Sequence, residues 1–301
     1  MRRAVLAALA VALTHLTAAP ARADADAFWR HWSDGQAELN GYRLVQPRYG
    51  EAREGQAVLV FVTEPFSRSR LVKVDRWDPE DPDQFTALKL NHLRIFQTGI
   101  YDYRVMTSVF ADPAAGFEPV EVTFTSQEWC GHVFERLTRP SGGAEVVVDS
   151  YFEGESGKAS VAGPVVIEDA IFIQARGLMS GGPGSAPAGP AATLAPALVR
   201  RLKHLPANKA ATTFTWSGPS EVKVPAGAFT ARTLSWPRPD GVDCALDVEV
   251  QAPHRILGWR CDDGERAELT GSIRSPYWRQ NKEGDEKLLT KLGLWAPGKR
   301  K

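Results

Sequence analysis

The stretch QAVLVFVTEPF (56–66) decides the fold class. It is rich in β-branched and aromatic residues and is bounded by turn formers, which is typical of a β-strand. PVEVTFT (119–125) alternates apolar with polar residues, which predicts a strand with Val120, Val122 and Phe124 on one side. Further strand patterns cover 70–75, 87–97, 101–110, 132–138, 144–152, 212–216, 221–225, 228–236, 244–250, 255–261 and 266–273. The sequence therefore predicts a mainly β protein, an antiparallel and strongly curved sheet forming an open barrel or a sandwich.

A few short helices are expected at the two ends of the chain. In DADAFWRHW (24–32), Phe28 and Trp32 are four residues apart and share one helical face. Near the C-terminus, GDEKLLTKLGLW (284–295) has leucines at helical spacing.

The chain divides into a leader and two β regions. Residues 1–23 form the leader, 24–176 an N-terminal β-rich lobe, and 198–301 a C-terminal β lobe that ends in the terminal helix. Between the lobes, GLMSGGPGSAPAGPAATLAPA (177–197) is too poor in large apolar residues to form a core and is expected to be a loop or linker. One continuous domain is the alternative.

The leader predicts export. MRRAVLAALAVALTHLTAAPARA (1–23) has a basic start, a short apolar core and a small-x-small end, the pattern of a secretory signal cleaved near Ala23. The mature protein would then be periplasmic or secreted, without a transmembrane segment. Without the leader, the chain carries 33 basic against 36 acidic residues, a net charge of about −3. This balance argues against nucleic acid as a partner, which would require a basic face.

Hairpin geometry predicts a pairing for two of the three cysteines. Cys244 and Cys261 lie on two strand patterns that flank residues 251–254, and a hairpin centred between 252 and 253 places them opposite each other. Opposed side chains of an antiparallel pair are close enough for a disulfide, which persists in an exported protein. The sequence thus favours a structural disulfide, with two free thiols or a redox switch as alternatives.

Cys130 is then the unpaired thiol. In SQEWCGHVF (126–134), Cys130 and His132 are two residues apart, so they share a strand face. A hairpin centred near residues 141–142 would place Cys130 opposite Glu153 and His132 opposite Tyr151. A catalytic triad with Cys130 as nucleophile, His132 as base and Glu153 as orienting acid is one hypothesis. The others are a buried thiol beside a hydrogen-bonded core histidine, which is favoured, and a metal site, for which the ligands are too few.

Two neighbouring aromatic residues are binding candidates because of their closeness to this thiol. They are Trp129 and Tyr151, for which packing is the alternative role. The sequence contains no Gly-x-Ser-x-Gly, His-Glu-x-x-His, Cys-x-x-Cys or P-loop motif. No cofactor or metal is therefore predicted, and a non-enzymatic role is favoured over a thiol enzyme.

Several segments resemble an exported bacterial family of unknown function whose members often carry the name septum formation inhibitor Maf. They are QPRYGEAREGQAVLVFVTEPF (46–66), LKLN (88–91), FQTGIYDY (96–103), SQEWCGHVF (126–134), SYFEGE (150–155), SPYWRQN (275–281) and LGL (292–294). The activity of true Maf proteins, cytoplasmic nucleotide pyrophosphatases, does not follow from this resemblance. VPAGAF (224–229) and AEL (267–269) also resemble the DUF3108 group of envelope proteins, which implies a curved antiparallel sheet.

These observations lead to one functional hypothesis and two alternatives. The protein is expected to be a periplasmic or cell-envelope β scaffold that binds an apolar small molecule or another envelope component in a cleft. Nine tryptophans support this hypothesis, because tryptophan is amphipathic and common at binding surfaces. The alternatives are the thiol enzyme built on Cys130 and His132 and a structural envelope protein that binds no small ligand.

Overall fold

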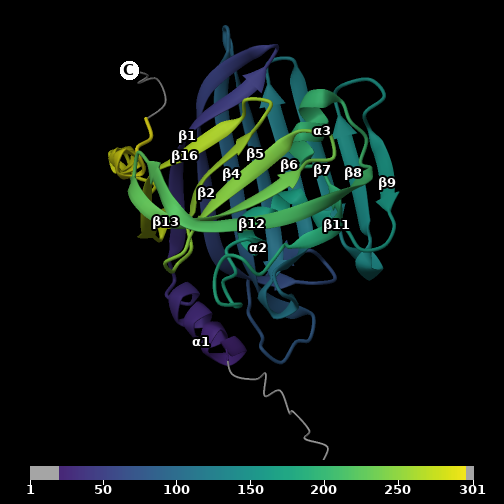
Figure 1. Ribbon diagram of the computed structural model, residues 1–301. Helices are drawn as coiled ribbons and strands as arrows, with labels where there is room; N and C mark the ends of the chain where they lie inside the picture. The colour runs from purple at the N-terminus through teal and green to yellow at the C-terminus, as the bar shows by residue number, and fades with distance from the viewer. Residues whose placement is uncertain (1–19, 296–301) are drawn as a thin grey trace, which may run out of the picture.

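The strands of both halves of the chain join one continuous sheet (Figure 1). The computed structural model describes residues 20–295, without the side chains of residues 20–23 and 141. The first half contributes β1 (Ala37–Arg48), β2 (Glu51–Ser67), β3 (Val72–Lys73), β4 (Gln84–Thr98), β5 (Tyr101–Asp112), β6 (Glu118–Glu128), β7 (Gly131–Thr138), β8 (Ala144–Ser150) and β9 (Gly157–Val161). The second half contributes β10 (Val166–Ile167), β11 (Gly189–Leu194), β12 (Lys209–Val224), β13 (Gly227–Pro237), β14 (Asp243–Glu249), β15 (Ile256–Cys261) and β16 (Arg266–Ser275).

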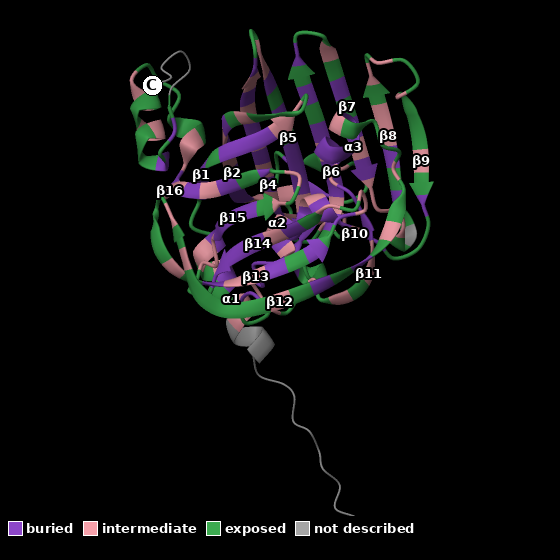
Figure 2. Ribbon diagram, turned by 45° about the horizontal axis from the view of Figure 1, so that its top comes forward, coloured by how far each residue is buried: buried purple, intermediate pink, exposed green. Residues whose placement is uncertain are grey.

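The sheet is an open, curved meander. Successive strands pair antiparallel from β1 to β9, with β3 on the side of β2, and again from β11 to β16. The two meanders meet where β1 pairs with β16. The hydrogen-bonded path starts at β10 and ends at β9, so the strongly curved sheet does not close on itself (Figure 2). The prediction of a mainly β, antiparallel and open architecture is confirmed.

Short helices pack against the curved sheet and add side chains to its core. They are α1 (Pro20–Trp32), the 3₁₀ turn η3 (Glu168–Ala170), α2 (Ile171–Gln174) and α3 (Ala197–Lys203). Phe28 and Trp32 of α1 are buried in the main core, as their spacing predicts, and Ile171 and Ile173 of α2 pack into the same cluster. The open sheet thus acquires a core from helices and from its own inner side chains.

Two segments differ in detail from the structure that the sequence predicts. Val120 lies at a β-bulge between β5 and β6 and packs in a satellite cluster with Phe66, whereas Val122 belongs to the main core. In the glycine- and proline-rich stretch 177–197, residues Gly189–Leu194 form strand β11, which pairs with β12. Small side chains can join a sheet because its ladder uses backbone groups.

The two ends of the chain follow the predicted pattern in part. The C-terminal segment is a 3₁₀ helix, η5 (Asp285–Leu292), which packs on the outer side of β1 and β2 through Leu292. The first 19 residues of the predicted leader lie outside the described residues. Within the described range, no helix is long and apolar enough to cross a bilayer.

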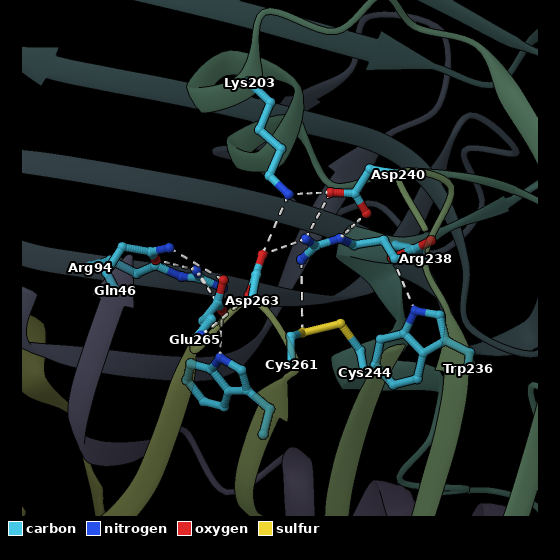
Figure 3. The surroundings of a disulfide bond; sticks show 12 residues. Gln46, Arg94, Lys203, Trp236, Arg238, Asp240, Cys244, Cys261, Asp263 and Glu265 are labelled. Carbon is cyan, nitrogen blue, oxygen red and sulfur yellow. Dashed lines mark hydrogen bonds and ion pairs between the residues drawn. A yellow bond between two sulfur atoms is a disulfide. The ribbon is translucent and has the colours of Figure 1, made fainter. Parts of the chain in front are cut away.

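The predicted disulfide is present in the β14–β15 hairpin. Cys244 pairs directly with Cys261 in the ladder, and their Cα atoms are 4.1 Å apart (Figure 3). The register that the sequence predicts therefore holds at the cysteines, although a bulge at Asp247 and Val248 shifts it nearer the turn. Arg238 donates to the Cys261 sulfur at 3.8 Å and forms ion pairs with Asp240 and Asp263.

Glu168 is a buried acid at the centre of the fold. Trp236 donates its indole N–H to Oε2 of Glu168 at 3.1 Å, while Oε1 has no hydrogen-bond partner among the described residues. Burial raises the pKa of Glu168 from 4.5 to about 8, despite the opposing hydrogen bond from Trp236. The folded protein therefore keeps a proton on this carboxyl at neutral pH.

The disulfide predicts a stability loss on removal. Replacing Cys244→Ala together with Cys261→Ala should lower the free energy of unfolding by about 3 kcal/mol, because the cross-link restricts the unfolded chain. Urea unfolding measures this difference. Cys130→Ala is the matched control, since that thiol is exposed and unpaired. Equal stability of the double variant and the control would contradict the structural role of the disulfide.

Glu168 predicts a pH-dependent stability. Between about pH 4.5 and 8 the folded state holds a proton on Glu168 that the unfolded chain releases, so the free energy of unfolding falls as the pH rises through this window. Glu168→Gln cannot ionise and should lose less stability over the same range. Urea unfolding at several pH values tests this expectation. Parallel pH profiles for the two proteins would show that Glu168 does not titrate as proposed.

Candidate functional site

Cys130 lies at the tip of the β6–β7 hairpin. Glu128 pairs with Gly131, which leaves Trp129 and Cys130 as a two-residue turn. The sequence predicts Cys130 on a strand face with His132, but only His132 belongs to strand β7. Cys130 and His132 are both exposed, so the prediction of a buried thiol beside a core histidine is wrong. The hairpin turn therefore sets the position of this thiol.

The predicted partners of Cys130 are distributed over two neighbouring turns. Tyr151 donates its backbone N–H to the carbonyl of His132 at 3.0 Å, which places these residues opposite each other as predicted. Glu153 is exposed in the loop between β8 and β9. The carboxylate beside Cys130 is instead that of Glu128, whose Oε2 accepts the Cys130 backbone N–H at 2.6 Å.

The electrostatic surroundings favour the neutral thiol of Cys130. A hydrogen bond to Glu128, together with partial desolvation and the negative charge of that residue, raises the pKa of Cys130 above its ordinary value of 9.0. A nucleophilic cysteine requires a lowered pKa. The thiol-enzyme hypothesis gains no electrostatic support, and the reactivity of Cys130 stays a prediction.

Trp129 and Tyr151, the predicted binding residues, are exposed beside this turn. They are 70% and 72% exposed, respectively. The Trp129 ring lies 6.3 Å from the Tyr101 ring, and the Tyr151 ring covers Gly131. A Cβ atom at Gly131 would come within 2.5 Å of that ring, so only glycine fits there. Their exposure leaves both rings accessible at the rim of the sheet.

A cavity of about 330 Å³ lies between the inner face of β6–β9 and the segment that begins with α3. The strands supply an apolar wall that includes Phe124, Val133 and Val146. Arg200 and Arg201 of α3 form the opposite side. Figure 2 shows α3 inside the curve of the sheet, facing β6 and β7. The cavity thus combines an apolar wall with a charged side, to which Glu135 and Glu155 also contribute.

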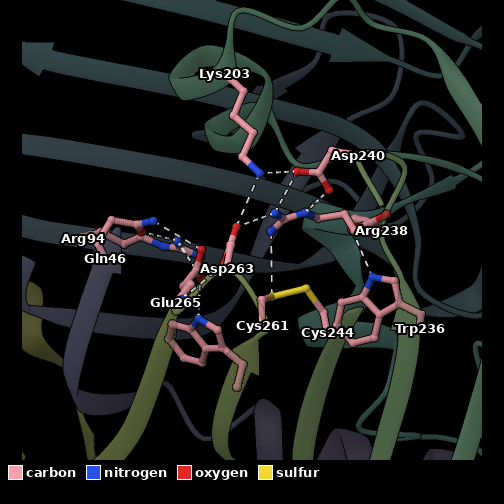
Figure 4. Close-up of polar contacts among 12 residues, drawn as sticks. Gln46, Arg94, Lys203, Trp236, Arg238, Asp240, Cys244, Cys261, Asp263 and Glu265 are labelled. Atoms are coloured by element: carbon pink, nitrogen blue, oxygen red, sulfur yellow. Dashed lines mark hydrogen bonds and ion pairs between the residues drawn. A yellow bond between two sulfur atoms is a disulfide. The ribbon is translucent and has the colours of Figure 1, made fainter. Parts of the chain in front are cut away.

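Polar contacts along α3 hold it against the sheet. Arg200 is buried and forms an ion pair with Glu135 of β7. Arg48 donates to the carbonyl of Leu202 at 2.8 Å. At the end of α3, Lys203 reaches Asp240 at 2.6 Å (Figure 4). The helix is therefore fixed from several strands.

The network at Lys203 connects α3 to the disulfide hairpin. Lys203 also lies 3.5 Å from Asp263, and Arg238 bridges Asp240 and Asp263 (Figure 4). Burial would raise the pKa of Asp240, but its hydrogen bonds from Arg238 and Lys203 outweigh this and lower it to about 2. The ionised network ties the cavity-lining helix to the cross-linked strands.

Sequence reasoning assigned no role to the arginines of α3. The segment ALVRRLK (197–203) follows the glycine- and proline-rich stretch, and its helix has only seven residues. Two adjacent arginines flanked by apolar residues in this short helix are the signal that could have identified the charged side of the cavity. Glu135, the ion-pair partner of Arg200, lies 65 residues away in the chain.

The raised pKa of Cys130 predicts slow alkylation. Iodoacetamide at pH 7.5 should modify native Cys130 more slowly than the same cysteine in the unfolded chain, because less thiolate is present. Glu128→Gln removes the negative acceptor and should accelerate the reaction. The rate is measured by mass spectrometry across a pH series. Alkylation faster in the native state would contradict this expectation and favour the thiol enzyme.

Comparisons with known proteins identify one structural neighbour. No protein-family model matches the chain, and no curated protein matches it. A search of solved structures finds the crystal structure of a beta-barrel-like protein of a domain of unknown function, DUF1849, from Brucella abortus. The two chains are 11% identical and align with a TM-score of 0.45, over 79% of this chain and 97% of the other. The chain is thus similar in outline to a β-barrel-like protein of unknown function.

Proposed function

We propose that this protein is a non-enzymatic, exported protein of the periplasm or cell envelope that binds an apolar small molecule. The binding site is the cavity between the inner face of β6–β9 and α3. The observation that carries this proposal is the apolar wall of that cavity, to which Phe124, Val133, Val146 and Val148 contribute. Small-molecule sites are commonly concave, apolar and equipped with a few polar groups.

Export has its own support. The leader pattern at residues 1–23 is that of a secretory signal. The disulfide between Cys244 and Cys261 is of the kind that persists outside the reducing cytoplasm. The resemblance to exported and envelope families points in the same direction.

A hollow on the outer side of the sheet is the competing location. It measures about 580 Å³ and is lined by Met106, Phe134 and His132. Met106 and Phe134 are more than a third exposed, so this hollow is a surface groove. The inner cavity is favoured as the binding site because Arg200 and Arg201 of α3 face its apolar wall, which supplies the few polar groups that orient a ligand.

A neutral apolar probe tests the proposed function. N-phenyl-1-naphthylamine should bind the wild-type protein and fluoresce more strongly in the apolar cavity. Ala159→Phe, in the wall of the cavity, should weaken this binding about tenfold or more by filling the space. Fluorescence titration measures the affinity, and circular dichroism checks that the variant is folded.

Ser160→Phe is the matched control. Ser160 is the exposed neighbour on the same strand, and its side chain points to the opposite face. This variant should bind the probe like the wild type. Equal binding by the Ala159 and Ser160 variants, or no binding by the wild type, would contradict the proposed site.

A further inference from the structure

Two arginines of α3 line the cavity, and they differ in whether their guanidinium groups have hydrogen-bond partners. Arg200 is satisfied, because it pairs with Glu135 and donates to the carbonyl of Ala195. Arg201, the next residue, also lines the cavity and is 7% exposed. Its Nε and Nη1 atoms are buried and have no hydrogen-bond partner among the described residues.

Two carboxylates lie near Arg201 without satisfying it. Glu128 and Glu155 are each 4.0 Å from its guanidinium, at the outer limit of an ion pair and beyond hydrogen-bond distance. Both accept closer donors. Glu128 accepts the backbone N–H of Cys130, and Glu155 is bonded to Ser150 at 2.7 Å and to His204 at 2.5 Å.

The position of the Arg201 side chain is nevertheless fixed. Its guanidinium carbon lies 4.0 Å from the centre of the Phe152 ring, which supports the planar group from one side. A buried guanidinium with unused donors is costly unless a partner accepts them. The structure therefore holds a preorganised cation at the edge of an apolar cavity.

We propose that Arg201 binds the carboxylate of a single-chain anionic amphiphile whose alkyl chain occupies the cavity against Phe124 and Val146. This inference rests on the proposed function and specifies the class of its ligand. A carboxylate is the natural partner of a guanidinium, and the charge-assisted hydrogen bonds between them are strong. The alkyl chain would meet the apolar wall formed by β6, β7 and β8.

The size of the cavity sets the length of the ligand. About 330 Å³ is at the lower end of the range of small-molecule pockets, which is roughly 300–1,000 Å³. This volume fits one medium-length alkyl chain and is too small for a two-chain phospholipid. Decanoate is therefore a suitable probe, and 1-decanol is its uncharged counterpart.

Isothermal titration calorimetry with these two probes tests the inference. Wild-type protein should bind decanoate about 10- to 100-fold more tightly than 1-decanol, as charge-assisted hydrogen bonds predict. Arg201→Gln should remove this preference while it still binds 1-decanol. Arg43→Gln, which replaces an exposed arginine on strand β1, should behave like the wild type.

The outcomes separate the two proposals. Equal affinity for the two probes in wild-type protein, or an unchanged preference in Arg201→Gln, would overturn the role of Arg201 and leave the apolar cavity as a binding site. Failure of both probes and of the neutral fluorescent probe would overturn the proposed function as well. If Arg201→Gln does not fold, decanoate titrated into wild-type protein from pH 7.5 down to pH 4 provides the test. Binding should then weaken as the carboxylate is protonated, and pH-independent binding would contradict the inference.

Discussion

The pairing of β1 with β16 is the constraint on which the rest of the structure depends. It joins the first and last strands of the sheet-forming chain and turns two sequential meanders into one curved sheet. The end of η5 packs directly on the β1–β16 pair. Gly41 and Gly271 have no Cβ atoms there, which leaves room for the backbone around Leu292. A Cβ atom at Gly41 would lie 2.2 Å from the Leu292 carbonyl oxygen, so the C-terminal segment can cover this ladder only because glycine stands there.

Because the sheet does not close into a barrel, other segments of the chain must cover its inner face. Here α1 and α2 fill one part with large apolar side chains, while α3 packs on β6 and β7 through Ala197 and Leu198 and through the ion pair of Arg200 with Glu135. Arg200 forms a buried ion pair with Glu135, and this ion pair attaches the helix to the sheet. Nε and Nη1 of Arg201 have no hydrogen-bond partner among the described residues, and Lys203 connects α3 to the disulfide hairpin. The same helix thus provides attachment and, in our proposal, ligand recognition.

Local features of the fold could be predicted from the sequence, and long-range features could not. The strand patterns and the Cys244–Cys261 pairing depend on alternation and hairpin arithmetic, which the sequence carries directly. The β-bulge at Val120 removes this residue from the strand face that carries Val122, and no sequence pattern indicates the bulge. The unsatisfied state of Arg201 depends on carboxylates committed to other donors in distant turns, which no local pattern reveals.

The central claim is that a ligand lies between the apolar inner face of the sheet and Arg201. A crystal structure of the protein with 10-bromodecanoate tests it most directly, because the anomalous signal of bromine locates the end of the chain. Bromine is expected against Phe124 and Val146, with the carboxylate at Arg201. Bromine in the outer groove beside Met106 and Phe134, or no ordered bromine at all, would contradict it.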